Sequence, residues 1–376
     1  MGAACPSRYH KLPIVDQTGR PQSPRGPQGL FKPGQLLTYH GESAALVLHA
    51  GPVTGRRPRF DDPQDIDALD RAAAVGGALP FDHTKFRSDE AQQAARLAHN
   101  GPRVIPLAAV HGDGGANLLL GAFYYSRYQA ALPQWPNDVA LQLQIIQTSI
   151  DAGQLGIVPG RTNDLGVVST VVTANGWMLL QVRSAKAGHE RERVATVMGE
   201  GVHPDHFSLG GTWAPIQSTL PPWFAPHRVQ GGMPEEVGLF AHHFIDPATD
   251  GSMIDMGGPL IVQLETGNIT AVGTARTNLT LEQVRKANAK AVDNWEGRMF
   301  AVRFRGEDDA VALMTDPTVL GRAAGRGKTR ETLTSWCVPA VLMAIERQMG
   351  LPLAAQLRDA VAVAPRGARA VGGVTA

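Results

Sequence analysis

The chain has 376 residues, with 35 lysines and arginines against 34 aspartates and glutamates, which gives a formal net charge of +1. This length allows about two or three domains with a sizeable core, and the balanced charge gives no reason to expect a nucleic-acid or membrane partner. Its two cysteines, Cys5 and Cys337, exclude a disulfide framework, and with neither a membrane-length apolar run nor a secretion signal we expect a cytoplasmic protein.

The first part of the chain predicts an arm followed by a small domain. Residues 1–35 are rich in proline, glycine and arginine, which is typical of an irregular arm without a core of its own. Residues 36–158 are expected to form a small α+β domain. Its expected elements are strands over 36–40, 43–50, 104–110 and 117–121, a helix over 65–74 with Ile66, Leu69 and Ala73 on one side, a helix capped by Ser88, and a helix over 138–150. Pro106 places the third of these strands at a sheet edge.

A glycine-rich loop around Pro159-Gly160 marks the expected boundary to a second domain, residues 159–355. Two β-rich runs, 165–174 and 177–183, flank Asn175-Gly176. This dipeptide is the strongest short hairpin signal, and it predicts a tight turn with positive φ at both residues. Further expected elements are strands over 240–246, 260–264, 269–273 and 298–304, a helix from the Thr280–Gln283 capping box to about residue 294, and a buried helix over 338–349 with Pro339 in its first turn. Residues 356–376 are expected to be a flexible tail.

Acidic residues and glycines gather between Gly199 and Gly238. Gly199-Glu200-Gly201 follows an extended segment, and Glu235-Glu236 precede Val237-Gly238 at what looks like the end of a short helix. Oxygen ligands of this kind can hold a hard cation. A solvated helix terminus is the alternative interpretation of the same residues.

The stretch Glu235-Glu236-Val237-Gly238-Leu239 resembles the end of the Nudix box, which closes with two glutamates, any residue, a glycine and an aliphatic residue. The order of the preceding segments, a strand, an Asn-Gly turn, a strand ending in Leu-Leu-Gln-x-Arg, a glycine turn and an acidic helix, is also similar to that of Nudix domains. The resemblance covers roughly residues 160–350. It implies an α/β chain whose second domain is a Nudix-like α/β/α sandwich with a mixed sheet.

The resemblance also implies a site. Glu235 and Glu236 would be catalytic and would bind Mg²⁺ or Mn²⁺ together with Glu200, and Glu296 would add a further carboxylate from downstream. We take Arg183, Gly199 and Gly201 as candidate ligand-binding residues. The expected ligand is a small nucleotide-like molecule, and a homodimer or a protein partner remains open.

Two functions are compatible with these residues. One is a Mg-dependent hydrolase of nucleoside diphosphate-linked compounds. The other is a Nudix-like module that binds a nucleotide-like or other diphosphate-containing ligand, with catalysis weak or lost. Phe207, Gly231 and Gly232 occupy positions where the box has its glutamate and its Arg-Glu pair. Because phosphoryl transfer depends on metal charge and positioning, these replacements favour the binding module.

Two other motifs suggest a binding site, one for a metal ion and one for a phosphate group. His203, His206, His242 and His243 with Asp246 could form a metal site, but scattered surface histidines are the commoner explanation. Residues 321–329 resemble a phosphate-binding loop with one residue too many between the glycines. The basic segment Arg322–Arg330 could instead contact an anionic ligand, and a solvated basic loop is the interpretation we favour.

Overall fold

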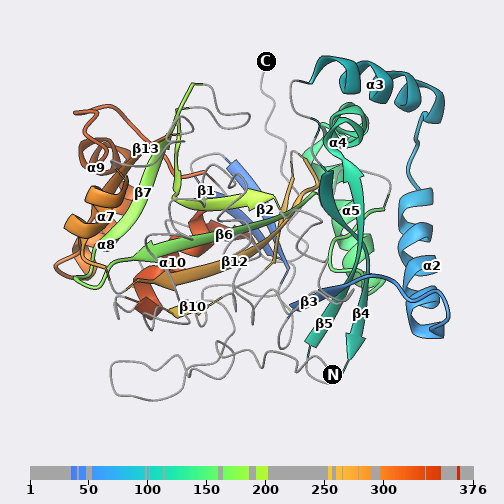
Figure 1. Ribbon diagram of the computed structural model, residues 1–376, viewed down its shortest axis with the longest axis horizontal. Coiled ribbons are helices and arrows are strands. Elements are labelled where there is room, and N and C mark those ends of the chain that lie inside the picture. The colour runs from blue at the N-terminus through green and yellow to red at the C-terminus, as the bar shows by residue number, and fades with distance from the viewer. Residues whose placement is uncertain are drawn as a thin grey trace.

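The computed structural model describes residues 35–39, 42–47, 53–97, 100, 102–112, 115–159, 164–185, 192–201, 253–255, 260–264, 266–277, 279–288, 297–334, 336–348 and 362–364. The described chain is an α/β structure with a long mixed sheet and a smaller three-stranded sheet (Figure 1). The strand expected over 240–246 lies outside these residues, as do most of the expected arm and tail.

The long sheet has eleven strands among the described residues. Along its main path they are β13 (Gly297–Val302), β7 (Met178–Arg183), β6 (Leu165–Val172), β12 (Ile269–Arg276), β11 (Leu260–Gln263), β2 (Glu42–Val47), β1 (Gln35–Tyr39) and β14 (Ala362–Ala364). The short strand β10 (Met253–Asp255) pairs with β12. Strands β6 and β12 run parallel to each other, whereas the other described pairs in this sheet are antiparallel, so the sheet is mixed.

Strands β6 and β7 form the hairpin that the Asn-Gly dipeptide predicted, and they diverge after two paired residues on each strand. The run 194–201 fills the gap, with β8 (Val194–Thr196) on β7 and β9 (Met198–Gly201) on β6. Strand β7 therefore pairs with β6 at its beginning and with β8 towards its end. This divergence places Arg183, the last residue of β7, away from the hairpin turn.

The prediction of positive φ at both turn residues is right for Gly176, whose φ is 78°, and wrong for Asn175. The Gly176 amide donates to the Thr173 carbonyl at 2.9 Å, and the Thr173 amide donates to Trp177 at 2.8 Å. This is a three-residue loop that ends in a left-handed glycine, and such a loop needs positive φ only there. The Asn175 side chain instead accepts from the Leu281 amide, 3.1 Å away, where helix α7 (Leu281–Asn288) begins.

Side chains of the long sheet point alternately to its two faces, and both faces are buried. In β6, Leu165 and Val171 pack on one side, and Val168 and Val172 pack on the other. This is the period of two that side chains follow along a strand. A strand buried on both faces reads as a nearly continuous apolar run, and the sequence of 165–172 shows such a run with Ser169 and Thr170 as its polar residues.

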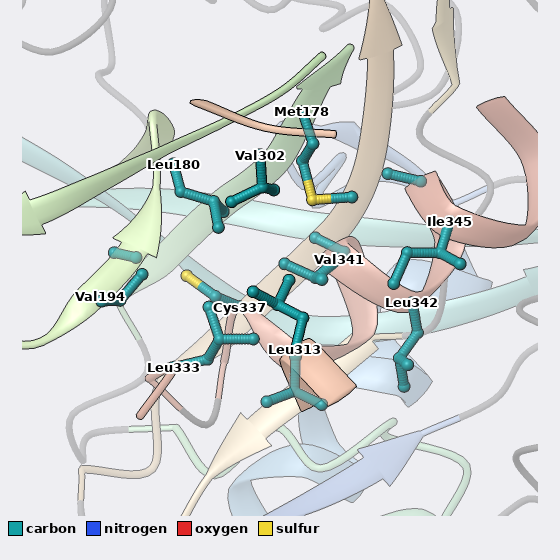
Figure 2. Packing of buried hydrophobic residues seen from close by; sticks show 14 of the residues in the cluster. Met178, Leu180, Val194, Val302, Leu313, Leu333, Cys337, Val341, Leu342 and Ile345 are labelled. Carbon is teal, nitrogen blue, oxygen red and sulfur yellow. The ribbon is translucent and has the colours of Figure 1, made fainter. Parts of the chain in front are cut away.

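Helices from the end of the chain cover one face of the long sheet. They are α8 (Glu307–Thr315), α9 (Pro317–Ala323), α10 (Val338–Met343) and the π-helical turn η5 (Ala344–Gln348). Figure 2 shows Val341, Leu342 and Ile345 packed together with Met178, Leu180 and Val302 of the sheet. The buried helix predicted over 338–349 is confirmed for its described residues, with Pro339 in the first turn. Helices α8 and α9 were not predicted.

The smaller sheet packs against the opposite face. It consists of β3 (Val53–Arg56), β5 (Gly115–Tyr124) and β4 (Pro102–Gly112), and β4 lies at its edge as Pro106 predicted. Around it lie α2 (Pro63–Gly77), α3 (His83–Arg96), α4 (Tyr125–Ala131), the 3-10 turn η1 (Leu132–Gln134) and α5 (Val139–Asp151) (Figure 1). The Trp135 indole donates to the Leu264 carbonyl at 2.6 Å and ties this part to the long sheet.

Two details of the helices differ from the prediction. Helix α3 is capped by Asp82, whose side chain accepts from the Thr84 and Lys85 amides, so Ser88 lies inside the helix and not at its start.

Helix α2 buries Ala68, Ala72 and Val75, whereas Ile66 is 42% exposed. The buried Asp65 sets this rotation, because it forms an ion pair with Arg56 and accepts from the Arg59 amide at 2.7 Å. The Arg56 guanidinium holds the pKa of the Asp65 carboxyl below its usual value.

The long sheet draws strands from both sides of the boundary expected near residue 159. Strand β2 pairs with β11 through Ala44–Val47, and β1 pairs with β2 and with β14. Residues 36–39 and 42–47, which we expected in the first domain, thus belong to the sheet of the second. None of the helices in the described ranges combines the length and the apolar character needed to cross a bilayer.

Candidate functional site

The described residues contain only part of the predicted acidic site. Glu235, Glu236 and Glu296 lie outside them, and Glu200 is described through its backbone, which pairs with Val167 across β9 and β6. The described residues include no group of three or more histidine, cysteine, aspartate or glutamate side chains that could hold a metal ion. The part of the predicted metal set that is described therefore does not by itself form a site for Mg²⁺ or Mn²⁺, and that site stays a prediction.

Gly199 and Gly201 belong to strand β9, where they pair with Val168 and Gly166. A Cβ atom at Gly199 would lie 2.7 Å from the Trp336 ring, so this position has no room for a side chain. The glycine thus allows Trp336 to approach the sheet closely. Neither glycine is among the described residues that line the pocket presented next.

A pocket of about 400 Å³ lies where β7 ends, β13 begins and the chain returns towards β8. Its described lining is rich in charge and is made of Val182, Arg183, Ser184, Ala185, Glu192, Gly297, Arg298 and Arg326. Three arginines and one glutamate are therefore among the residues that line a single cavity. Of the residues that we predicted to bind a ligand, Arg183 lies here.

Arg183 is fixed by strand pairing on both sides of β7. Its partner in β13 is Gly297, and on the other side its amide donates to the Arg193 carbonyl at 2.8 Å while its carbonyl accepts from the Glu192 amide at 3.1 Å. A Cβ atom at Gly297 would lie 2.7 Å from the Val182 carbonyl oxygen. Glycine at this position lets the two backbones approach each other at the floor of the pocket.

Arg298 and Arg326 reach the pocket from different elements. Arg298 follows Gly297 in β13 and donates to the carbonyl of Ala324, the residue after helix α9. Arg326 lies in the loop after that helix, and its Nη1 atom donates to the Glu192 carbonyl at 3.0 Å. Both arginines thus connect the end of α9 to the pocket, and Arg326 is the residue of the basic segment Arg322–Arg330 that lines it.

The loop that carries Arg326 is tightly folded. The Arg326 amide donates to the Gly321 carbonyl at 2.9 Å, and both Gly325 and Gly327 have positive φ, near 70°. Glycine adopts this backbone conformation without steric cost. Glu192, across the pocket, is one of two non-glycine residues with positive φ in the described chain, at 61°. Its carbonyl and amide are both hydrogen-bonded to pocket arginines, which holds the residue in this conformation.

Gly321 provides a test of this loop. A Cβ atom at Gly321 would lie 1.8 Å from the Thr329 carbonyl oxygen, so Gly321→Ala forces the loop to move. We expect a loss of roughly 1–3 kcal/mol in the free energy of unfolding, as for other substitutions that overpack a closely filled position. Gly77→Ala at the end of α2 is the control, because nothing lies within 4 Å of the added Cβ and the position is helical. Equal unfolding curves for the two variants in urea would contradict the packing described here.

A second group of titratable side chains lies between the two sheets. The Asp164 amide donates to Asn268 Oδ1 at 3.1 Å, and Asn268 Nδ2 donates to the Tyr128 hydroxyl at 3.2 Å. Although part of Asp164 reaches the surface, its Oδ1 atom is buried and has no hydrogen-bond partner among the residues that the structure describes. Burial raises the pKa of the Asp164 carboxyl to about 6, against the opposing charge of Arg103. Burial also raises the pKa of Tyr128.

From the sequence we predicted Arg183 as a ligand-binding residue and interpreted the segment that contains Arg326 as a solvated loop. No sequence pattern indicated a functional role for Arg298 or Glu192. Arg298 is one basic residue in a strand, and nothing near it in the sequence indicates that Ala324 and Arg326 lie beside it. The Gly-rich spacing of 321–327 was the one available signal for a folded basic loop.

No protein-family model matches the chain, and no curated protein matches it.

Proposed function

We propose that this protein binds a small ligand that carries phosphate or diphosphate groups, with its anionic part in the pocket lined by Arg183, Arg298 and Arg326. The observation that carries the proposal is that three arginines from three separate segments are among the residues that line one pocket. Guanidinium groups bind phosphate oxygens through paired, charge-assisted hydrogen bonds. The pocket volume of about 400 Å³ lies within the range of small-molecule sites.

The resemblance of residues 235–239 to the end of the Nudix box supports the same class of ligand, and we propose a nucleotide-like or other diphosphate-containing molecule. Binding with catalysis weak or lost is the function that we favour. The alternative is Mg-dependent hydrolysis of nucleoside diphosphate-linked compounds, which depends on Glu235 and Glu236.

Calorimetric titration in phosphate-free buffer tests the proposal. We expect pyrophosphate and ADP to bind and adenosine not to bind, because adenosine lacks the anion. Each of Arg183→Gln, Arg298→Gln and Arg326→Gln should weaken pyrophosphate binding by about tenfold, since a charge-assisted hydrogen bond contributes roughly 1.5–3 kcal/mol. Higher salt should weaken it further, because the arginines are partly exposed.

Arg87→Gln is the matched control, because it removes the same charge from an exposed position on α3. We expect it to leave the dissociation constant of pyrophosphate near the wild-type value. Binding that all three pocket variants retain, or an absence of binding by both pyrophosphate and ADP, would contradict the proposal. Turnover of ADP derivatives with Mg²⁺ that Glu235→Gln abolishes would favour the hydrolase.

A further inference from the structure

Glu331 is a buried carboxylate behind the arginine pocket. Its side chain is 7% exposed, and its Oε1 atom lies 3.2 Å from Nη1 of Arg326. Glu331 is not among the residues that line the pocket. Its contact with the pocket therefore passes through the Arg326 guanidinium, which also donates to the Glu192 carbonyl.

The backbone around Glu331 is fixed to the body of the molecule. Its amide donates to the Pro317 carbonyl at 3.0 Å, and the carbonyl of the next residue, Thr332, accepts from the Val194 amide at 3.2 Å. Thr332 also accepts from Arg193 through its hydroxyl at 3.0 Å. Glu331 is thus anchored to α9 on one side and to β8 on the other, so its carboxylate offers Arg326 an immobile partner.

We propose that Glu331 is a positioning residue for the anion pocket: it holds the Arg326 guanidinium in place before the ligand arrives. This inference rests on the proposed function. A free arginine side chain loses rotamer freedom when it closes on a ligand, and a side chain that is already held does not lose it again. Among the described residues, both protein contacts of this guanidinium are made by Nη1, so its other N–H groups can bind the ligand.

The direction in which one substitution changes the pyrophosphate affinity distinguishes a positioning role of Glu331 from a purely electrostatic effect. Glu331→Gln removes a negative charge next to an anion site, so charge alone predicts tighter binding of pyrophosphate. Positioning predicts the opposite, a dissociation constant about fivefold higher, since immobilising one long side chain costs roughly 0.5–1.5 kcal/mol. Glu192→Gln is the matched control: it removes the same charge from an exposed carboxylate that lines the pocket, and it should tighten binding.

The experiment is a titration of wild type, Glu331→Gln, Arg326→Gln and the double variant with pyrophosphate. If Glu331 acts through Arg326, adding Glu331→Gln to Arg326→Gln should cause no further loss, and the two substitutions should be non-additive. Glu331→Asp keeps the charge but moves the carboxylate away from Arg326, because the side chain is one methylene group shorter. It should also weaken pyrophosphate binding, and it replaces Glu331→Gln in the experiment if that variant does not fold.

Binding by Glu331→Gln and Glu331→Asp at or above the wild-type affinity would overturn the positioning role while leaving the proposed function intact. An equal loss in the Arg326→Gln background would also overturn it, because the effect would then not pass through Arg326. Wild-type protein that binds no pyrophosphate would overturn the proposed function, and this inference with it.

Discussion

Ile345→Asp is expected to unfold the chain. Ile345 is fully buried in η5, which packs against β6 and β12, and Figure 2 shows it beside Val341 and Leu342 within the apolar cluster. A carboxylate at this position would lose its hydration with no apolar neighbour able to replace it. We expect a loss of at least about 4–5 kcal/mol, which is comparable to the total stability of many domains.

The measurement is thermal unfolding followed by circular dichroism, with two comparisons. Leu141→Asp on α5, where the leucine is 41% exposed, should cost less than about 1 kcal/mol, as surface substitutions usually do. Ile345→Val should cost about 0.5–1.5 kcal/mol and give a folded protein for measurement if the aspartate variant is insoluble. An Ile345→Asp protein that melts like Leu141→Asp would place this face of the helix in solvent.

Asp164→Asn is expected to stabilise the protein at neutral pH. The pKa of this carboxyl is raised from 3.8 to about 6 by burial, so the folded state holds its proton up to a higher pH than the unfolded chain. The contribution of this group to the free energy of unfolding is therefore fully present below about pH 4 and is lost as the pH rises through 6. The shift is equivalent to a cost on the order of 3 kcal/mol at pH 7, which the uncharged amide avoids.

Urea unfolding of wild type and Asp164→Asn at pH 4, 5, 6 and 7 measures this effect. The difference in unfolding free energy should grow towards pH 7 in favour of the variant. Tyr125, Tyr128 and Arg103 interact electrostatically with Asp164, and burial raises the pKa of both tyrosines further above this pH range. Asp308→Asn, at an exposed position in the first turn of α8, is the control, and the difference should not grow in favour of this variant. A difference for Asp164→Asn that stays constant from pH 4 to pH 7 would contradict the prediction.

The sequence predicted elements whose signals are local. The hairpin of β6 and β7, the capping box at Thr280 and Gln283, and the apolar helix from Val338 each depend on residues within one or two turns of chain. In the structure the Thr280 amide donates to Gln283 Oε1 at 2.8 Å, and the Gln283 amide donates back to Thr280 Oγ1 at 3.4 Å. These predictions needed no knowledge of the rest of the fold.

Features set by distant residues were not predictable in the same way. The rotation of α2 depends on the ion pair of Asp65 with Arg56. Arg56 ends strand β3 and lies outside the helical pattern from which the rotation was predicted. The pairing of β2 with β11 joins residues more than 200 positions apart, which composition around the loop at 153–160 could not indicate. The pocket has the same character, because Arg183, Arg298 and Arg326 converge only after β7 and β13 have paired and α9 has packed beside them.

A crystal structure of the protein soaked with pyrophosphate tests the central claim most directly. The account predicts density for the anion within hydrogen-bond distance of the guanidinium groups of Arg183, Arg298 and Arg326, with Arg326 still in contact with Glu331. Pyrophosphate bound elsewhere on the molecule, with this pocket holding only water at a concentration that saturates binding in solution, would contradict it.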